Sequence, residues 1–95
     1  MGKNKIAAAL AAALELPEEA ALALPRLTLL GQERLTVENH QGIVVYGPNR
    51  VVCATCLGPL EIAGRDLRLG YLAPEELTIT GSIAGLTWME RGENP

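Results

Sequence analysis

Hydrophobic and polar residues alternate with a period of two along most of the chain that follows Pro25. This alternation is typical of half-buried strands, whose successive side chains point to opposite faces of a sheet. Glycine, proline, asparagine and aspartate, which favour turns, separate the runs. The apolar positions that share a phase fall into the following runs: Leu27 and Leu29, Leu35 and Val37, Ile43 and Val45, Val51 and Cys53, Leu60 and Ile62, Leu67, Leu69 and Tyr71, Leu77 and Ile79, Leu86 and Trp88.

These runs predict a mainly β fold, a small antiparallel β-sandwich or β-roll of about eight short strands. Between the runs there is no helical pattern of the length that a parallel α/β sheet needs for its crossover connections. The segments "LEIAGRDLRLGYL" and "LTITGSIAGLTW" share a spacing of apolar residues and glycine, but two copies are weak evidence for a solenoid. We expect the core to consist of Leu27, Leu29, Leu35, Val37, Ile43, Val45, Val51, Cys53, Leu60, Ile62, Leu67, Leu69, Leu77, Ile79 and Trp88.

The N-terminal segment has a different pattern, which predicts a helix within residues 1–24. In "NKIAAALAAALEL", Ile6, Leu10 and Leu14 recur every four residues among alanines, the best helix formers. A secretory signal peptide is the alternative interpretation, with residues 6–14 as its apolar core and residues 21–23 as its cleavage site. Because the apolar stripe is narrow and a lone short helix is marginal in water, we expect the helix to dock on a sheet face or a partner.

Length and charge limit the classes of protein that need to be considered. The 95 residues suffice for a single domain, with a helical segment over residues 1–24, a β domain over 25–90 and a tail over 91–95. Hydrophobic residues make up 48% and charged residues 20%, as in a globular protein. The net charge of −3 argues against a nucleic-acid partner. No apolar run is long enough to predict a membrane span.

Cys53 and Cys56 form a CxxC pattern. Together with His40, the only histidine, they supply three of the four ligands of a tetrahedral zinc site. On a regular strand, however, cysteines three positions apart point to opposite faces. We therefore expect ordinary packing or surface thiols, with no metal and no cofactor, and keep metal or redox use as the alternative.

Glu38, Asn39 and His40 are the nearest approach to a cluster of functional side chains. In the functional interpretation, Glu38 orients His40 as a base or ligand. In the structural interpretation, which we favour, Asn39 adopts a turn conformation and His40 packs against the turn. No motif of a nucleophile, a phosphate loop or a metalloprotease is present, so we expect no catalytic residues and no enzymatic activity.

Several short motifs resemble the YabP/YqfC family of bacterial sporulation proteins, and the YqfC branch most closely. They are Glu15-Leu16-Pro17, Leu24-Pro25-Arg26, Thr28, Gly31, Glu38-Asn39-His40 with Gly42-Ile43, Gly58, Gly64 and Gly81. The resemblance covers residues 14–88. Cys53, Cys56 and an N-terminus poor in lysine and arginine depart from the pattern.

The resemblance implies a non-enzymatic structural or interaction protein of endospore formation. It implies a place in the cytoplasm of the mother cell, or a peripheral place at the forespore envelope or spore coat. The expected partners are further copies of the chain and a sporulation membrane protein. Glu38, Asn39 and His40 then either fix the fold or form part of a contact surface. A small ligand- or metal-binding module that uses His40 with Cys53 and Cys56 is the alternative function.

Overall fold

The computed structural model describes residues 24–90 and the single positions 8 and 92. Within these residues the chain forms a six-stranded antiparallel sheet with the strand order β1-β2-β6-β5-β4-β3. The strands are β1 (Arg26–Leu30), β2 (Arg34–Glu38), β3 (Ile43–Tyr46), β4 (Arg50–Cys53), β5 (Leu60–Leu72) and β6 (Glu76–Trp88). The predicted mainly β, antiparallel fold is confirmed. The helix predicted over residues 1–24 lies almost entirely outside the described residues.

The predicted number of eight strands is wrong, because two pairs of expected strands are continuous. β5 contains both the run at residues 60–62 and the run at residues 67–69, and β6 contains the runs at 77–79 and 86–88. The glycines between these runs predicted turns. In the structure they mark bends within two strands of 13 residues each.

The bends occur where the backbones of β5 and β6 approach closely. Their pairing register shifts over residues 63–68 of β5, as it does at a β-bulge. A Cβ atom on Gly64 would collide with the carbonyl oxygen of Ser82, and a Cβ atom on Gly81 would lie 2.5 Å from that of Asp66. Gly81 also has a φ of 131°, which side-chain-bearing residues rarely adopt. Glycine is therefore needed at both positions for the sheet to bend.

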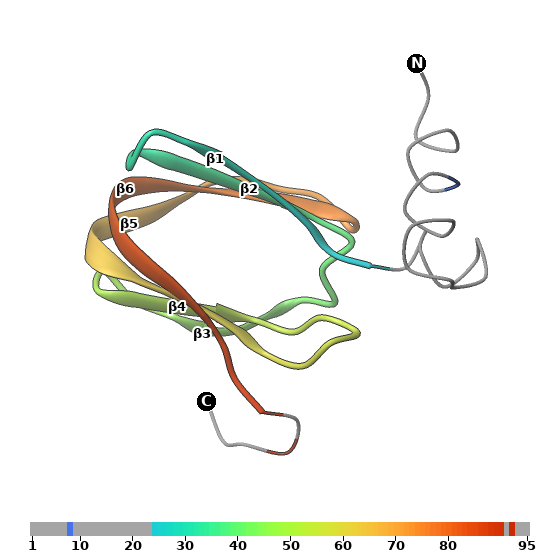
Figure 1. Ribbon diagram of the computed structural model, residues 1–95. Helices are drawn as coiled ribbons and strands as arrows, with labels where there is room; N and C mark the ends of the chain where they lie inside the picture. Colours follow the sequence, from blue (N-terminus) through green and yellow to red (C-terminus); the bar gives the residue numbers. More distant parts are fainter. Residues whose placement is uncertain (1–7, 9–23, 91, 93–95) are drawn as a thin grey trace.

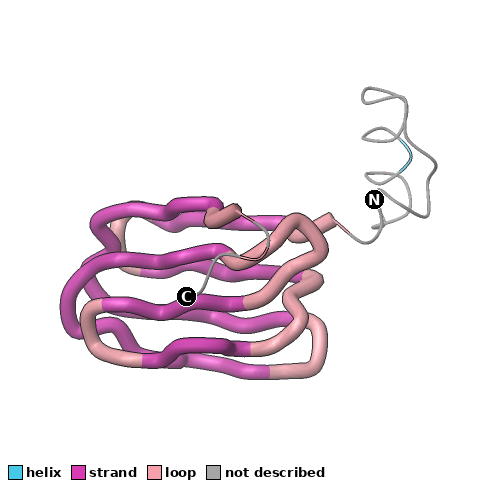
Figure 2. Tube along the Cα trace, turned by 90° about the horizontal axis from the view of Figure 1, so that it is seen from below, coloured by secondary structure: helices cyan, strands magenta, loops and turns pink. Residues whose placement is uncertain are grey.

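The bends fold the sheet over on itself into two facing layers (Figure 1). The first layer consists of β1, β2, residues 76–80 of β6 and residues 68–72 of β5. The second layer consists of β3, β4, residues 60–63 of β5 and residues 85–88 of β6. Viewed from below, strands run side by side and the loops gather at their ends (Figure 2). We call the end away from the bends the open end.

Buried side chains from both layers form the core. Nine of the predicted core residues are buried: Leu35, Val37, Val51, Cys53, Leu60, Ile62, Leu67, Leu77 and Ile79. Three more predicted residues, Leu27, Ile43 and Leu69, are partly buried and pack against this cluster. The period-two pattern therefore identified the inward face of most strands correctly.

Three assignments to the core are wrong. Leu29 and Trp88 are 48% and 45% exposed. Leu29 belongs to β1 at the end of the sheet, and Trp88 is the last residue of β6. Val45 pairs with Val52, on the face opposite Val51 and Cys53, because the register of β3 shifts after Ile43.

The buried hydrophobic residues that the pattern did not identify are Val52, Ile83 and Met89. Val52 lies opposite Glu61 across the strand pair, and Glu61 accepts a hydrogen bond from Arg50 Nε. The aliphatic parts of these two charged side chains flank Val52 and help to shield it from water.

Candidate functional site

The segment of residues 39–42, which we call the strap, crosses the open end from β2 in the first layer to β3 in the second (Figure 1). Its backbone is bonded to both layers. Asn39 N–H donates to the carbonyl of Glu75 in the β5–β6 turn, at 2.6 Å. Gln41 N–H donates to the carbonyl of Ala54 at 2.7 Å, and Ala54 N–H donates to that of Gly42 at 2.9 Å. The strap therefore ties the two layers together where the sheet itself does not connect them.

Asn39 begins the strap in a left-handed conformation, with a φ of 64°. Asparagine tolerates this conformation better than other residues that carry a side chain. Its Nδ2 donates a hydrogen bond to the carbonyl oxygen of Leu24, at 2.9 Å. Asn39 thus turns the chain out of β2 and also holds the segment that leads into β1.

His40 is buried, with 8% of its surface exposed. Its Nδ1 accepts a hydrogen bond from Gly42 N–H at 2.9 Å, and its Nε2 lies 3.0 Å from the carbonyl oxygen of Ala73. A carbonyl oxygen only accepts and a backbone N–H only donates, so the proton of the neutral ring sits on Nε2. Both ring nitrogens are thereby engaged with the backbone. Binding a metal or acting as a base would require one of these bonds to break.

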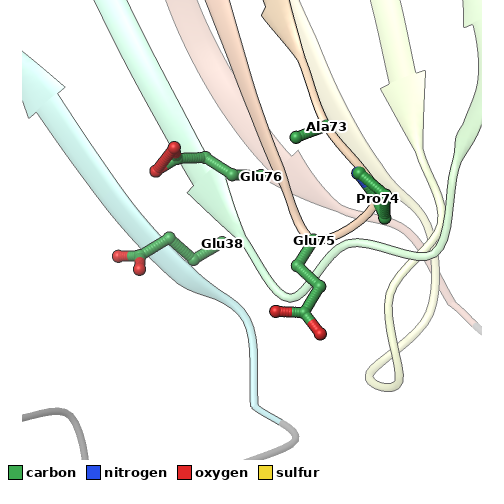
Figure 3. Close-up of a pocket in the computed structure, with 5 residues that line it drawn as sticks. All are labelled: Glu38, Ala73, Pro74, Glu75 and Glu76. Carbon is green, nitrogen blue, oxygen red and sulfur yellow. The ribbon is translucent and has the colours of Figure 1, made fainter.

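Glu38, at the end of β2, is not the partner of either ring nitrogen of His40 in these two hydrogen bonds. The Oε2 atom of Glu38 lies 3.7 Å from Nε of Arg26, its cross-strand neighbour in β1. On the other side Glu38 is paired with Glu76 of β6, and the two carboxylates lie beside each other in Figure 3. The prediction that Glu38, Asn39 and His40 form a contact surface stays a prediction.

Two open depressions flank the turn between β5 and β6. The first has a volume of about 490 Å³ and is lined by Glu38, Ala73, Pro74, Glu75 and Glu76 (Figure 3). The second, of about 560 Å³, is lined by His40, Gln41, Gly42, Ile43, Leu72, Ala73 and Pro74. Three carboxylates around the first depression favour basic groups over anions. Neither depression has the enclosed shape with which enzymes exclude water.

The two cysteines occupy different environments. Cys53 is fully buried in the core, and this burial raises the pKa of its thiol to about 11. Cys56 is partly buried in the turn after β4, and neither residue forms a disulfide. Because the thiolate is the reactive and metal-binding form, burial and the raised pKa disfavour Cys53 as a nucleophile or metal ligand at neutral pH. Across the described residues, no three His, Cys, Asp or Glu side chains lie close enough to hold a metal ion, so His40, Cys53 and Cys56 do not form a ligand set.

Several structural contacts had no signal in the sequence. The partners of the strap, at Leu24, Ala54, Ala73 and Glu75, are carbonyl groups, which every residue type carries. In a further contact, the hydroxyl of Tyr46 accepts a hydrogen bond from Leu69 N–H at 3.0 Å and joins β3 to β5. The pattern also gave no indication of Thr55, whose hydroxyl donates to the carbonyl of Gly58 and accepts from Leu57 N–H.

None of the helices within the described residues is long and apolar enough to cross a membrane. The described chain is a small antiparallel β protein whose sheet folds over on itself, and Asn39 and buried His40 tie its layers together at the open end. Residues 23–95 match the YabP family, and the chain belongs to this family. It is similar to the uncharacterized protein YqfC of Bacillus subtilis (strain 168), with 32% identity over 88 residues, 93% of this chain and 95% of YqfC.

Proposed function

We propose that the chain is a non-enzymatic sporulation protein that acts through protein–protein contacts during endospore formation. Membership of the YabP family and the similarity to YqfC over 93% of the chain support a role in sporulation, which is what the resemblance of the motifs implies. The proposed location is the mother cell, in the cytoplasm or peripherally at the forespore envelope or spore coat.

The observation that carries the interaction role is the set of large apolar side chains exposed around a well-formed core. Each is about half exposed or more, and they are Leu29, Leu30, Val44, Tyr46, Leu57, Tyr71, Leu72 and Trp88. Single exposed apolar residues are ordinary, but tyrosine and tryptophan are enriched at protein interfaces. The side chains of Asn39 and His40 in the strap, in contrast, are used to hold the fold together.

The proposed partners are further copies of the chain and a sporulation membrane protein. The chain would bind such a membrane protein peripherally, since the interaction role does not require the chain itself to cross the membrane. Tyr71 and Leu72, at the end of β5, are 55% and 54% exposed and lie next to the β5–β6 turn. They are neighbours in sequence and form a compact target for mutation.

Complementation tests this proposal. Bacillus subtilis cells that lack YqfC would express the chain from a sporulation promoter, and heat-resistant spores would be counted. We expect the chain to restore spore yield and a fluorescent fusion to surround the forespore. A double variant, Tyr71→Ser with Leu72→Ser, should fold normally but restore fewer spores. Arg68→Ser, an exposed polar change on the same strand, is the matched control.

Two results would contradict the proposal. One is a normal yield of heat-resistant spores from cells without YqfC. The other is a folded chain that restores no spores and whose fusion spreads evenly through both compartments.

A further inference from the structure

Among the described strands, β1 ends the sheet on one side, and only one of its edges is paired. In the described part of the chain β1 pairs with β2 alone. The outward edge therefore presents backbone N–H and C=O groups to which no described strand is paired. Such an edge is a template for a further strand unless the protein blocks it.

β3 ends the sheet on the opposite side, and its edge is blocked in ways that the β1 edge is not. The register of β3 shifts between Ile43 and Val45, which indicates a bulge. Bulges twist an edge away from further pairing. The hydroxyl of Tyr46 also links β3 to Leu69 of β5 along this side. In contrast, all five residues of β1 pair with β2 in regular register.

β1 also carries apolar side chains that the described residues of its own subunit leave exposed. Leu27 and Leu29 pair with Val37 and Leu35, both fully buried, so they face the core. Leu29 nevertheless remains 48% exposed because the sheet stops at β1. On the outward face, Leu30 is 66% exposed. A strand added at this edge would cover these side chains as well as pair the backbone.

We propose that two copies of the chain pair through β1, antiparallel and on a two-fold axis at Thr28. In this register Leu27 lies opposite Leu29 of the second copy, and Thr28 lies opposite Thr28 of the second copy. Arg26 lies opposite Leu30 of the second copy. All five residues of each strand take part, and the two sheets become continuous.

The sequence of β1 is self-complementary in this arrangement. Aliphatic residues meet on the core-facing side, and two threonines meet at the centre, which are both favourable cross-strand pairs. The only charge in the strand, Arg26, is held near Glu38 of its own subunit and faces an aliphatic partner. Antiparallel pairing shifted to bring Arg26 opposite itself would place like charges together. The centred register therefore avoids repulsion and uses the whole strand.

A two-fold contact of this kind closes on itself, because each copy uses its β1 edge once. The bulged β3 edges remain at the outside, so the product is a dimer and not a fibre. Two strands of five residues bury less than the ~1,600 Å² of a standard interface, so we expect a dissociation constant that is roughly micromolar. This dimer would be the self-association named in the proposed function. Its biological role rests on the proposed function, but the pairing itself does not.

Charge placed at position 30 tests the register in the full chain. Leu30→Glu faces Arg26 of the second copy and should tighten the dimer, whereas Leu30→Lys faces the same arginine and should weaken it. Two such pairs form in each dimer, so the dissociation constants should differ by about tenfold. Sedimentation equilibrium measures them. Val44→Glu and Val44→Lys, at a similarly exposed position in β3, should leave both values equal.

Cross-linking tests the two-fold axis directly. In a Cys56→Ser background, Thr28→Cys places two thiols on directly opposite residues, whose Cα atoms are about 4.5–5.5 Å apart in antiparallel pairs. This separation lies within the range of a disulfide, so mild oxidation should give a covalent dimer. Thr36→Cys, in the neighbouring strand β2, should not cross-link at the same rate.

A full chain that stays monomeric at high micromolar concentration overturns the pairing. If its β1 amides are then protected from hydrogen exchange, another segment of the same chain occupies the edge. If they exchange freely, the edge is empty. Equal dissociation constants for the two variants at position 30 also overturn the register. A monomer that restores spores would reject the dimer and leave the proposed function standing, while a dimer that restores none would do the reverse.

Discussion

His40 Nε2 donates a hydrogen bond to the carbonyl oxygen of Ala73, 33 positions further along the chain, at a distance of 3.0 Å. The other ring nitrogen accepts from Gly42 N–H at 2.9 Å. One imidazole thus connects the turn of the β5–β6 hairpin to the strap that leads into β3. The two hydrogen bonds give the imidazole a structural role that does not depend on contact with a substrate.

Replacing this imidazole should destabilise the fold. His40→Ala leaves the N–H of Gly42 and the carbonyl of Ala73 without their partner, and a buried unsatisfied group costs about 1–3 kcal/mol. We expect a loss of roughly 2–4 kcal/mol in the free energy of unfolding, measured by urea denaturation. Gln41→Ala, an exposed change in the same strap, is the control and should alter stability by less than about 0.5 kcal/mol. Equal stability of the two variants would argue that His40 has a role other than holding the fold.

Asn39 offers a test that separates backbone conformation from side-chain bonding. Asn39→Gly removes the hydrogen bond to Leu24 but accepts the φ of 64° without strain. Asn39→Ala removes the same bond and adds the cost of a left-handed conformation, about 1–2 kcal/mol. Thermal unfolding should therefore give a higher melting temperature for the glycine variant than for the alanine variant. The reverse order would show that the left-handed conformation is not maintained in solution.

The bend in the sheet depends on glycine at positions 64 and 81. Gly64→Ala would bring a methyl group against the carbonyl of Ser82, and Gly81→Ala would do the same at Asp66. Backbone carbonyls cannot move aside as a flexible side chain can, so we expect each variant to lose at least about 2 kcal/mol of stability. Gly85→Ala, where the space for a methyl group is open, is the matched control in the same strand. Circular dichroism during urea titration would distinguish the three proteins.

These glycines also show why the sequence predicted the faces of the strands better than their number. Across the bulge in β5 the inward positions change from even numbers, Leu60 and Ile62, to odd numbers, Leu67 and Leu69, yet both sets reach one core. Glycine at a hairpin turn and glycine at a bulge look the same in the sequence. The distinction depends on the partner strand, which is remote in the chain. Eight expected strands therefore became six.

The errors in the core have a related cause. Periodicity gives the face on which a side chain lies, but not the distance of its strand from the edge of the sheet. Leu29 shares the inward face of Leu35, yet it is half exposed because, among the strands of residues 24–90, β1 has one neighbour and β2 has two. At the strap, Asn39 and His40 could be identified from residue type, since asparagine favours turns. Their carbonyl partners at Leu24 and Ala73 could not, because main-chain groups leave no mark on the sequence.

The buried thiol of Cys53 should make stability depend on pH above neutrality. Burial raises its pKa from 9.0 to about 11, so the unfolded chain loses this proton at a lower pH than the folded chain. The stabilisation is fully present below pH 9.0 and is lost as the pH rises through about 11. Each pKa unit corresponds to about 1.4 kcal/mol, so Cys53 contributes up to roughly 3 kcal/mol to this decline. Urea denaturation at several pH values in this window, compared with Cys53→Ala, isolates the contribution, because the variant retains the other titrating groups. We expect stability to decline more steeply with pH in the parent chain than in the variant.

Thiol labelling provides a second, separate measurement of the burial of Cys53. At pH 8 we expect a thiol reagent to label Cys56 rapidly and Cys53 slowly. Parallel declines in the two proteins, or equal labelling of the two thiols, would show that Cys53 is accessible to water in the folded state.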